Sequence, residues 1–270
     1  MTLLSDQADA VRALVESADP GAVWAVGGPD GPHAGSGAAD DVHDVGGLTA
    51  VLALWPAVGT LVDEGALRLH TPLTAYGDEA AADTPAGTTA HHLLTHPGGT
   101  AALTRLVEHL SGSTLAELAA VRVWKPLGMT GTRLADGTLR APLADLALFL
   151  RHLLHPGDPD KPSDAVAPDA GGGASAPPPP TRAWTAESLR IRTGELTPAR
   201  GLLWHPAPHG VWTHHAPTDP GPAVWISPRH HRWAVLLPAA RSSLRTTFRE
   251  AVFTPEGSTR SAGPGGIPQV

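Results

Sequence analysis

The side chains that most often carry covalent or acid–base chemistry are unevenly represented in this sequence. It holds 15 histidines and one tyrosine, Tyr76, but no cysteine and no asparagine. Only two lysines occur, Lys125 and Lys161. A thiol nucleophile, a disulfide framework and a cysteine-ligated zinc site are therefore excluded. Chemistry that needs lysine, tyrosine and asparagine together is nearly excluded as well.

Two hydroxyl side chains stand where a nucleophile could be considered. Ser36 lies between Gly35 and Gly37, but the Gly-x-Ser-x-Gly spacing of a nucleophile elbow is missing. Short Ser–Gly pairs mostly serve turns, so we expect Ser36 in a turn or strand. Thr49 has no lysine or evident base three residues later, where a helix would bring one to the same face. Thr49 is therefore only a minor candidate for a displaced nucleophile.

The histidines could indicate a metal site. His92 and His96 are four residues apart on an expected helix, and further histidines occur in pairs later in the chain. No His-Glu-x-x-His motif accompanies them. We expect helix capping and hydrogen bonding in the core for these side chains, with no metal and no cofactor. The histidines weighed for this role are His91, His92, His96, His214, His215, His230 and His231.

Length and charge limit the class of protein. The 270 residues suit one large domain or two closely packed subdomains. The net charge of −7 argues against a nucleic-acid partner, which requires clustered basic residues. Residues 1–26 lack the pattern of a signal peptide, and the longest apolar stretch, 49–62, is too short for a membrane span. We expect a cytoplasmic protein with no membrane partner, and the sequence leaves its oligomeric state open.

Hydrophobic patterning predicts strands and a helix at both ends of the chain, with helices between them. A helix is expected over 6–16, strands over 21–26 and 33–38, and mainly helices from 46 to 156. Residues 158–180 contain few large apolar residues and predict a linker or long loop. Strands follow over 201–205, 211–214, 223–227 and 233–237, then a helix over 241–253. The pattern predicts an α/β domain made from both ends, an inserted helical domain and a ligand site in the cleft between them.

Three segments carry a resemblance to a known family. Residues 49–67 read TAVLALWPAVGTLVDEGAL, residues 89–99 read TAHHLLTHPGG and residues 124–132 read WKPLGMTGT. Together they resemble the serine β-lactamase and penicillin-binding-protein-like family of class C type, which includes esterases and D-aminopeptidases. The resemblance covers roughly residues 10–253, with apparent deletions near 100–104 and 134–140. It implies a β-lactamase/DD-peptidase-like fold of the α/β (α+β) class, with an antiparallel sheet flanked by terminal helices and a helical insertion.

The same resemblance implies three catalytic elements, and each is lost or damaged here. Gly47 and Ala50 occupy the serine and lysine positions of Ser-x-x-Lys, and neither side chain can attack or accept a proton. The Tyr-x-Asn element cannot exist without asparagine, and Tyr76 precedes the segment at 89–99. Of the His-Thr-Gly or Lys-Thr-Gly strand, only His214 and His215 remain as a vestige, near Pro217.

These observations predict a β-lactamase-related protein that is most simply a pseudoenzyme with a binding or vestigial role. A small molecule in the interdomain cleft is the candidate partner. Two alternatives stay open: a weak esterase or amidase using a displaced nucleophile or a histidine-bound metal, and a decaying gene product with no biochemical role. The expected domains are 1–44 with 184–253 as the sheet subdomain, 45–157 as the helical subdomain, 158–183 as a linker and 254–270 as a disordered tail.

Overall fold

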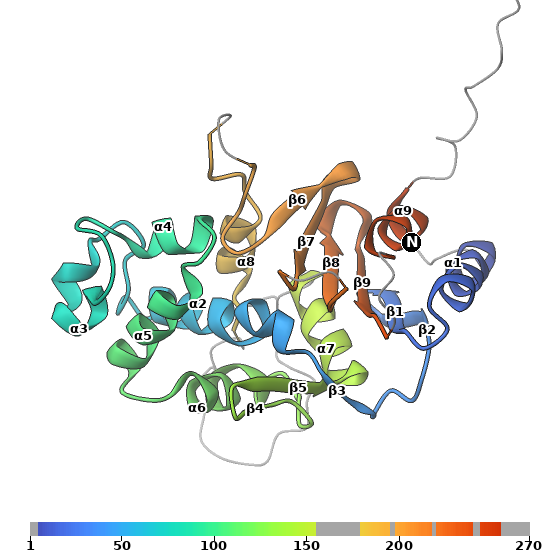
Figure 1. Cartoon of the computed structure of the whole chain (residues 1–270), viewed down its shortest axis with the longest axis horizontal. Helices are drawn as coiled ribbons and strands as arrows, with labels where there is room; N and C mark the ends of the chain where they lie inside the picture. The colour runs from blue at the N-terminus through green and yellow to red at the C-terminus, as the bar shows by residue number, and fades with distance from the viewer. Residues whose placement is uncertain (1–4, 155–178, 195–197, 218–219, 240–243, 255–270) are drawn as a thin grey trace, which may run out of the picture.

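A computed structural model of the chain describes residues 5–154, 179–194, 198–217, 220–239 and 244–254 (Figure 1). The expected tail and most of the expected linker lie outside these residues. The last residues of that linker are described and begin a helix, α8, whose first turn is capped by the hydroxyl of Thr181. Among the described residues, no helix combines the length and the apolar character needed to cross a membrane.

A six-stranded antiparallel sheet joins the two ends of the described chain (Figure 1). The strand order is β2-β1-β9-β8-β7-β6, so the N-terminal hairpin lies beside the C-terminal strands, as the sequence predicts. In the β1–β9 pair, Val23 lies opposite Leu237 and Gly27 opposite Trp233. The strands are β1 (Val23–Gly28), β2 (Gly31–Gly35), β6 (His205–Ala207), β7 (Val211–His215), β8 (Ala223–Ser227) and β9 (Arg232–Leu237).

Helices cover both faces of this sheet. The terminal helices α1 (Ser5–Ala18) and α9 (Arg245–Phe253) lie against each other on one face, where Trp24 and Phe248 pack edge to face. The opposite face is covered by α7 (Leu143–Leu154), which packs against β1, β9, β8 and β2. By residue number α7 falls in the expected helical subdomain, but it serves as a covering layer of the sheet.

Helices α2 to α6 form the inserted part, on the left of Figure 1. A capping box begins α6 at Thr114, since its hydroxyl accepts the amide of Glu117 and the Glu117 carboxylate accepts the amide of Thr114. The helices of this part are α2 (Trp55–Asp63), α3 (Asp78–Ala81), α4 (Ala90–Thr95), α5 (Thr100–Ser111) and α6 (Leu115–Ala119), with short helical turns at η1 (Gly46–Leu48), η2 (Ala50–Leu54), η3 (Leu73–Tyr76) and η4 (Ala120–Trp124). Outside it are α8 (Arg182–Ser188), η5 (Pro208–Gly210), which connects β6 to β7, and η6 (Pro228–His230), which connects β8 to β9.

A second, three-stranded sheet has two of its strands in the section that the sequence predicts to be mainly helical. It has the order β3-β5-β4 and comprises β3 (Val42–Asp44), β4 (Arg133–Ala135) and β5 (Thr138–Pro142). Asp136 and Gly137 connect β4 to β5, and both have positive φ, of 52° and 72°. An Asp-Gly pair is a favoured two-residue hairpin turn because both residues tolerate this conformation. The hairpin signal was therefore in the sequence but was read as part of a helical region.

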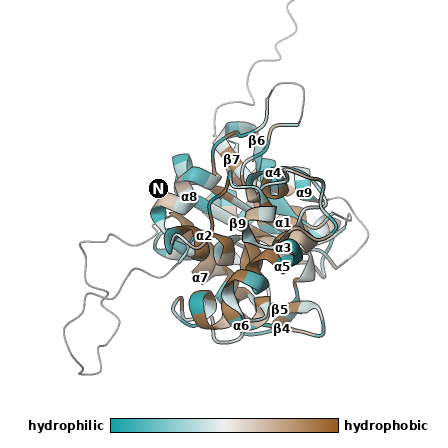
Figure 2. Ribbon diagram, turned by 90° about the vertical axis from the view of Figure 1, so that its left-hand side faces the viewer, coloured by the Kyte–Doolittle hydropathy of each residue, from teal (hydrophilic) through white to brown (hydrophobic). Residues whose placement is uncertain are grey.

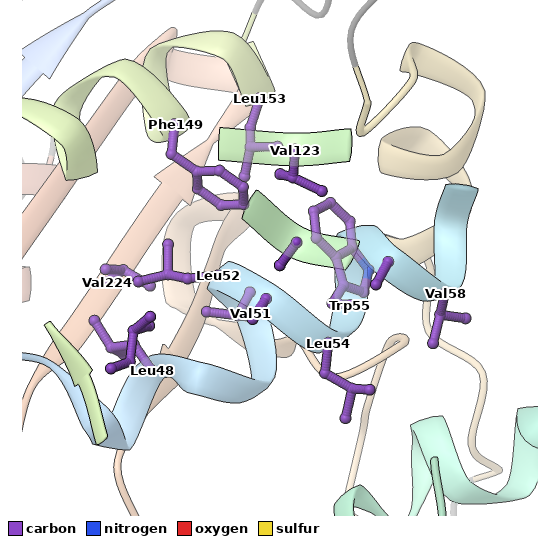
Figure 3. Packing of buried hydrophobic residues seen from close by; sticks show 14 of the residues in the cluster. Leu48, Val51, Leu52, Leu54, Trp55, Val58, Val123, Phe149, Leu153 and Val224 are labelled. Carbon is purple, nitrogen blue, oxygen red and sulfur yellow. The ribbon is translucent and has the colours of Figure 1, made fainter. Parts of the chain in front are cut away.

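Three tryptophans and a phenylalanine form the centre of the larger core. Trp55 packs against Phe149, Trp184 and Trp204, with ring centroids 5.9–6.4 Å apart. Apolar residues gather along α2 and α7, which Figure 2 shows in brown, and Figure 3 shows Trp55 and Phe149 among them. Gly59 of α2 lies against the indole of Trp184, so that a Cβ there would overlap the ring. This core joins the inserted helices to the sheet.

Pro56 stands in the first turn of α2, which follows directly on η2. One other expectation differs from the structure in detail. The strand expected over 201–205 begins only at His205, because the preceding residues form a turn in which the amide of Gly201 donates to the carbonyl of Trp204. In that turn Leu203 has a φ of 62°.

Candidate functional site

The position of the implied nucleophile lies in contact with the end of strand β7. Gly47 is the middle residue of η1, which is half-buried between the small sheet and the large one. A Cβ placed on Gly47 would collide with the Cβ of Ala216 and would lie 3.1 Å from the Cγ of Pro222. No real Cβ is found at such a distance from Ala216. A serine at position 47 is therefore sterically excluded unless this loop moves.

The loop that occupies this space is held by the backbone. Ala216 directly follows β7, is buried, and donates its amide to the carbonyl of Pro222 at 2.9 Å. That hydrogen bond continues the pairing of β7 with β8, whose last paired residues are His215 and Ala223. The methyl group of Ala216 is thus fixed against Gly47 by the sheet itself.

The position of the implied lysine carries no polar group. Ala50 begins η2, a wide helical turn in which the amide of Trp55 donates to the carbonyl of Ala50. The indole of Trp124 donates to the carbonyl of Leu52 at 2.9 Å, inside the same turn. Residues 51–54 are buried. The segment that the resemblance implies as catalytic is therefore packed as core (Figure 3).

Thr49, the candidate for a displaced nucleophile, uses its hydroxyl locally. Its Oγ1 donates to the carbonyl of Gly46 at 2.8 Å. That bond is of the kind that threonine commonly makes to the preceding turn of a helix. No side-chain base contacts this hydroxyl among the described residues. Nucleophilic attack would require both the loss of this bond and a proton acceptor from elsewhere.

His214, half of the vestigial third element, is buried and uncharged. Its Nδ1 lies 2.7 Å from the carbonyl of Leu203, and since a carbonyl only accepts, Nδ1 carries the proton. Its pKa is lowered to about 4, mainly by burial; the bond to Leu203 opposes the change, and the nearby His205 and His215 contribute to it. The ring packs edge to face against Trp204 at 6.5 Å. We interpret His214 as a structural residue that links β7 to the turn at Leu203.

His215 points away from that core and is exposed. Its Nδ1 lies 2.9 Å from the carbonyl of Ala216 and 3.4 Å from Nη1 of Arg245. Arg245 begins α9 and also donates to the carbonyl of Gly221. His215 therefore stands at the junction of β7, the 216–222 loop and α9. The structure brings His214 and His215 near one another but places them on opposite faces of the strand.

Tyr76 and Ser36 have structural partners. The hydroxyl of Tyr76 accepts the amide of Arg68 at 2.8 Å and lies 3.3 Å from the carbonyl of the same residue. The hydroxyl of Ser36 accepts the amide of Trp24 and donates to the carbonyl of Ala22, beyond the end of β2. Both hydroxyls are thus engaged by backbone groups, and Ser36 lies directly after β2, where its amide donates to the carbonyl of Trp24 in β1.

The histidines of α4 cap and pack rather than converge on one point. His92 Nδ1 accepts the amide of Thr89, whose hydroxyl accepts the amide of His92 in return. His91 stacks on His70 with centroids 4.7 Å apart, and burial, with His70 and Arg192 nearby, lowers the pKa of His91. Across the described residues, no group of three or more histidine or acidic side chains has the arrangement of a metal site.

Two cavities lie away from Gly47. One, of about 280 Å³, is lined by small residues of β2 and α7, including Gly35, Ala144 and Ala147. The other, of about 350 Å³, lies among α2, α5 and α6 and includes Leu61 and Val121. Neither is lined by Gly47, Ala50 or the end of β7, so neither is the cleft expected from the sequence.

Sequence reasoning missed three residues that shape the site. Ala216 and Pro222 fill the space beside Gly47, and Leu203 anchors His214. The contact of Gly47 with Ala216 depends on tertiary pairing of distant segments, and no local pattern signals it. A leucine at positive φ likewise leaves no trace in hydrophobic periodicity.

Solved structures with the same architecture are β-lactamases and D-alanine carboxypeptidases. A β-lactamase from Mycobacterium bovis matches with a TM-score of 0.64 and 20% identity, over 90% of this chain and 97% of that chain. A class C β-lactamase from Rhodobacter sphaeroides matches with a TM-score of 0.67 and 13% identity, over 91% and 97%. A D-alanine carboxypeptidase from Burkholderia cenocepacia matches with a TM-score of 0.67 and 15% identity, over 91% and 99%.

No protein-family model matches the sequence, and no curated protein resembles it closely enough to count as a relative. The likeness therefore rests on three-dimensional architecture: a sheet flanked by two terminal helices, a helical insertion, and nearly complete coverage of the compared chains. The chain has the β-lactamase/DD-peptidase-like fold.

Proposed function

We propose that this protein is a non-catalytic member of the β-lactamase and penicillin-binding-protein group, and that it acts by binding. The observation that carries the proposal is the contact of Gly47 with Ala216, which leaves no space for a nucleophilic side chain at the position implied by the resemblance. Serine acylation needs an oxygen there and a base beside it. Gly47 and Ala50 supply neither.

The neighbouring groups support the same proposal. Thr49 donates its hydroxyl to a backbone carbonyl, and the buried His214 has a pKa of about 4, far from the value near neutrality that favours a general base. The hydroxyl of Tyr76 is likewise engaged by the backbone of Arg68. A hydrolase with a displaced nucleophile would have to rearrange several of these contacts.

Covalent labelling tests the proposal. The purified chain is incubated with a fluorescent penicillin and with a fluorophosphonate probe, and the products are examined by intact mass. We expect no adduct with either probe. A stoichiometric adduct mapped by peptide mass to a serine or threonine contradicts the proposal. Thr49→Ala is the matched variant, because loss of labelling in this variant alone would identify Thr49 as the nucleophile.

A second measurement separates a binding protein from a chain without a biochemical role. Thermal unfolding is followed alone and with a panel of small molecules. We expect one cooperative transition, and a ligand at 100 times its dissociation constant should stabilise the native state by about 2.7 kcal/mol. A broad, non-cooperative transition would favour the decaying-product alternative over the proposed binding role.

A further inference from the structure

The cavity of about 350 Å³ among α2, α5 and α6 lies wholly within the inserted part of the molecule (Figure 1). Pockets for small ligands begin at about 300 Å³ and are mostly apolar, with a few polar groups that orient the ligand. This cavity has that composition, because its walls combine aliphatic side chains from several elements with a few charged and hydroxyl groups. The aliphatic residues are Leu61, Ala66, Leu110, Leu118 and Val121.

Val121 belongs to an unusual part of the chain, the turn η4. This is a π-helical turn, in which the amide of Lys125 donates to the carbonyl of Ala120, five residues earlier. Such turns are rare and are frequently found at functional sites. The side chain of Val121 is 62% exposed, whereas Leu61 on the opposite wall is buried. An exposed apolar side chain that borders a cavity is a surface that the apolar body of a ligand can cover.

Two carboxylates and one guanidinium line the same cavity, those of Glu64, Glu117 and Arg122. Glu64 and Arg122 form an ion pair in which both side chains are partly exposed. Glu117 accepts both of its hydrogen bonds from Thr114 at Oε2, and these bonds lower the pKa of its carboxyl. Within the described part of the chain, no hydrogen bond is made to its other oxygen, Oε1. The lining therefore has an excess of negative charge and favours a cation.

We infer that this cavity binds a small aliphatic ammonium ion, a primary amine with a short hydrocarbon chain. The chain packs against the aliphatic side chains that line the cavity. An ammonium group has three N–H donors and no acceptor, and it donates to the carboxylates of Glu64 and Glu117 and to the hydroxyl of Ser113, which also lines the cavity. The site is separate from Gly47, so the inference goes beyond the function proposed above and does not depend on it.

The test adds hexylammonium chloride to the full chain at pH 7 and follows the methyl signals by NMR. Sodium hexanoate, of opposite charge and equal chain length, and neutral hexan-1-ol are the control probes. We expect hexylammonium to cause saturable shifts of the methyl signals of Leu61, Leu110 and Val121, with a dissociation constant on the order of 1 mM for a ligand of this size. Hexan-1-ol should bind about threefold more weakly, because it lacks the charge. Hexanoate should bind more weakly still.

Three variants decide whether the charged groups of the lining are responsible. Glu117→Gln removes one negative charge but keeps a capping box, which glutamine also forms, and should weaken hexylammonium binding about threefold. Arg122→Gln should strengthen this binding, because it removes a positive charge and releases the carboxylate of Glu64 from its ion pair. Glu16→Gln, at an exposed position of α1 beside the large sheet, is the matched control and should leave the binding unchanged.

Several results would overturn this inference. They are the absence of a saturable shift with hexylammonium, equal binding of hexanoate, equal binding by the Glu117 and Glu16 variants, and weaker binding by the Arg122 variant. Covalent labelling by the penicillin probe would overturn only the non-catalytic role, because it reports on a different part of the molecule. The two proposals can therefore fail separately.

Discussion

At the scale of single residues, Gly47 has no side chain, and the methyl group of Ala216 fills the space that one would occupy. Gly47 lacks the Cβ that any nucleophile would need, and the methyl of Ala216 stands in its place. Since protein interiors tolerate little added volume, the two residues form a matched pair. The missing side chain of Gly47 and the position of the Ala216 methyl group are therefore parts of one packing arrangement.

The first prediction concerns this pair. Gly47→Ser should lower the free energy of unfolding by about 1–3 kcal/mol, because the new side chain overpacks against Ala216. Ala216→Gly should cost up to about 1 kcal/mol through backbone entropy. In the double variant the clash is relieved, so urea unfolding of all four proteins should give a favourable coupling of about 1 kcal/mol or more. Strict additivity would show that the loop yields freely and that the site is not sterically closed.

The second prediction concerns two buried hydroxyls on α8. Ser188 Oγ accepts the indole N–H of Trp55 at 2.9 Å, whereas Oγ1 of Thr185 is buried and makes no hydrogen bond. Ser188→Ala should lower the free energy of unfolding by about 1–3 kcal/mol, because the indole loses its acceptor. Thr185→Val, of nearly the same shape, should be neutral or stabilising. Chemical denaturation measures both, and equal losses would contradict the assigned hydrogen bond.

At the scale of elements, the hairpin turns show where the conformational preference of a residue matches the backbone conformation of the turn and where it does not. Asp136 and His209 each precede a glycine and each adopt a positive φ, of 52° and 64°. Aspartate tolerates this conformation better than most residues, and asparagine better still, since their short side chains bond to the local backbone. The turn at His209 therefore carries a residue that is not the preferred one.

The third prediction tests these preferences by substituting the residues at the two turn positions. His209→Asn should raise the free energy of unfolding by about 0.5 kcal/mol, and Asp136→His should lower it by a similar amount, because positive φ is more costly for histidine. Both positions are exposed, so packing changes little. Thermal unfolding of the two variants measures the effect. A loss of stability in both would show that side-chain contacts, not backbone conformation, decide the result.

The helices and strands show how much of the fold can be predicted from the sequence. The strands of the large sheet and the terminal helices follow from local hydrophobic periodicity, and their bounds are predicted within a few residues. The hairpin over 133–142 was missed, because strands of three and five residues carry too little alternation to stand out within a mainly helical stretch. The absence of a hydroxyl and an amine at the two positions implied by the resemblance could be read directly from Gly47 and Ala50. The filling of the site by Ala216 could not, because it follows from the packing of the β7–β8 loop against η1.

At the scale of the whole molecule, buried imidazoles make the stability of the fold depend on pH. His205 and His214 have pKa values of about 4, against 6.5 for the free side chain, with burial as the largest cause in both. The pKa values of His33, His91 and His230 are also lowered, again mainly by burial. Each of these groups binds its proton more tightly in the unfolded chain. Their contribution to stability is therefore complete above pH 6.5 and is lost as the pH falls, for His205 and His214 as it approaches 4.

The fourth prediction follows from the lowered pKa values of these histidines. The free energy of unfolding should fall progressively from pH 6.5 to pH 4, and the fully buried His214 should account for a loss on the order of 3 kcal/mol. His214→Gln should lower stability at pH 7 but flatten the pH dependence. The exposed His209→Gln serves as its control. Urea unfolding at several pH values measures the slope, and an unchanged slope in the His214 variant would refute the assignment.

The pairing of β1 with β9 also has a consequence for biosynthesis. Val23 finds its partner, Leu237, about 210 residues further along the chain. At ~5–20 residues per second, a ribosome needs about 10–40 s to make that partner after β1 has been synthesised. During this interval β1, five of whose six residues are buried in the final sheet, lacks the neighbour that completes its pairing. The nascent chain therefore presents an open strand edge, a substrate for chaperones, until nearly the whole sheet has been translated.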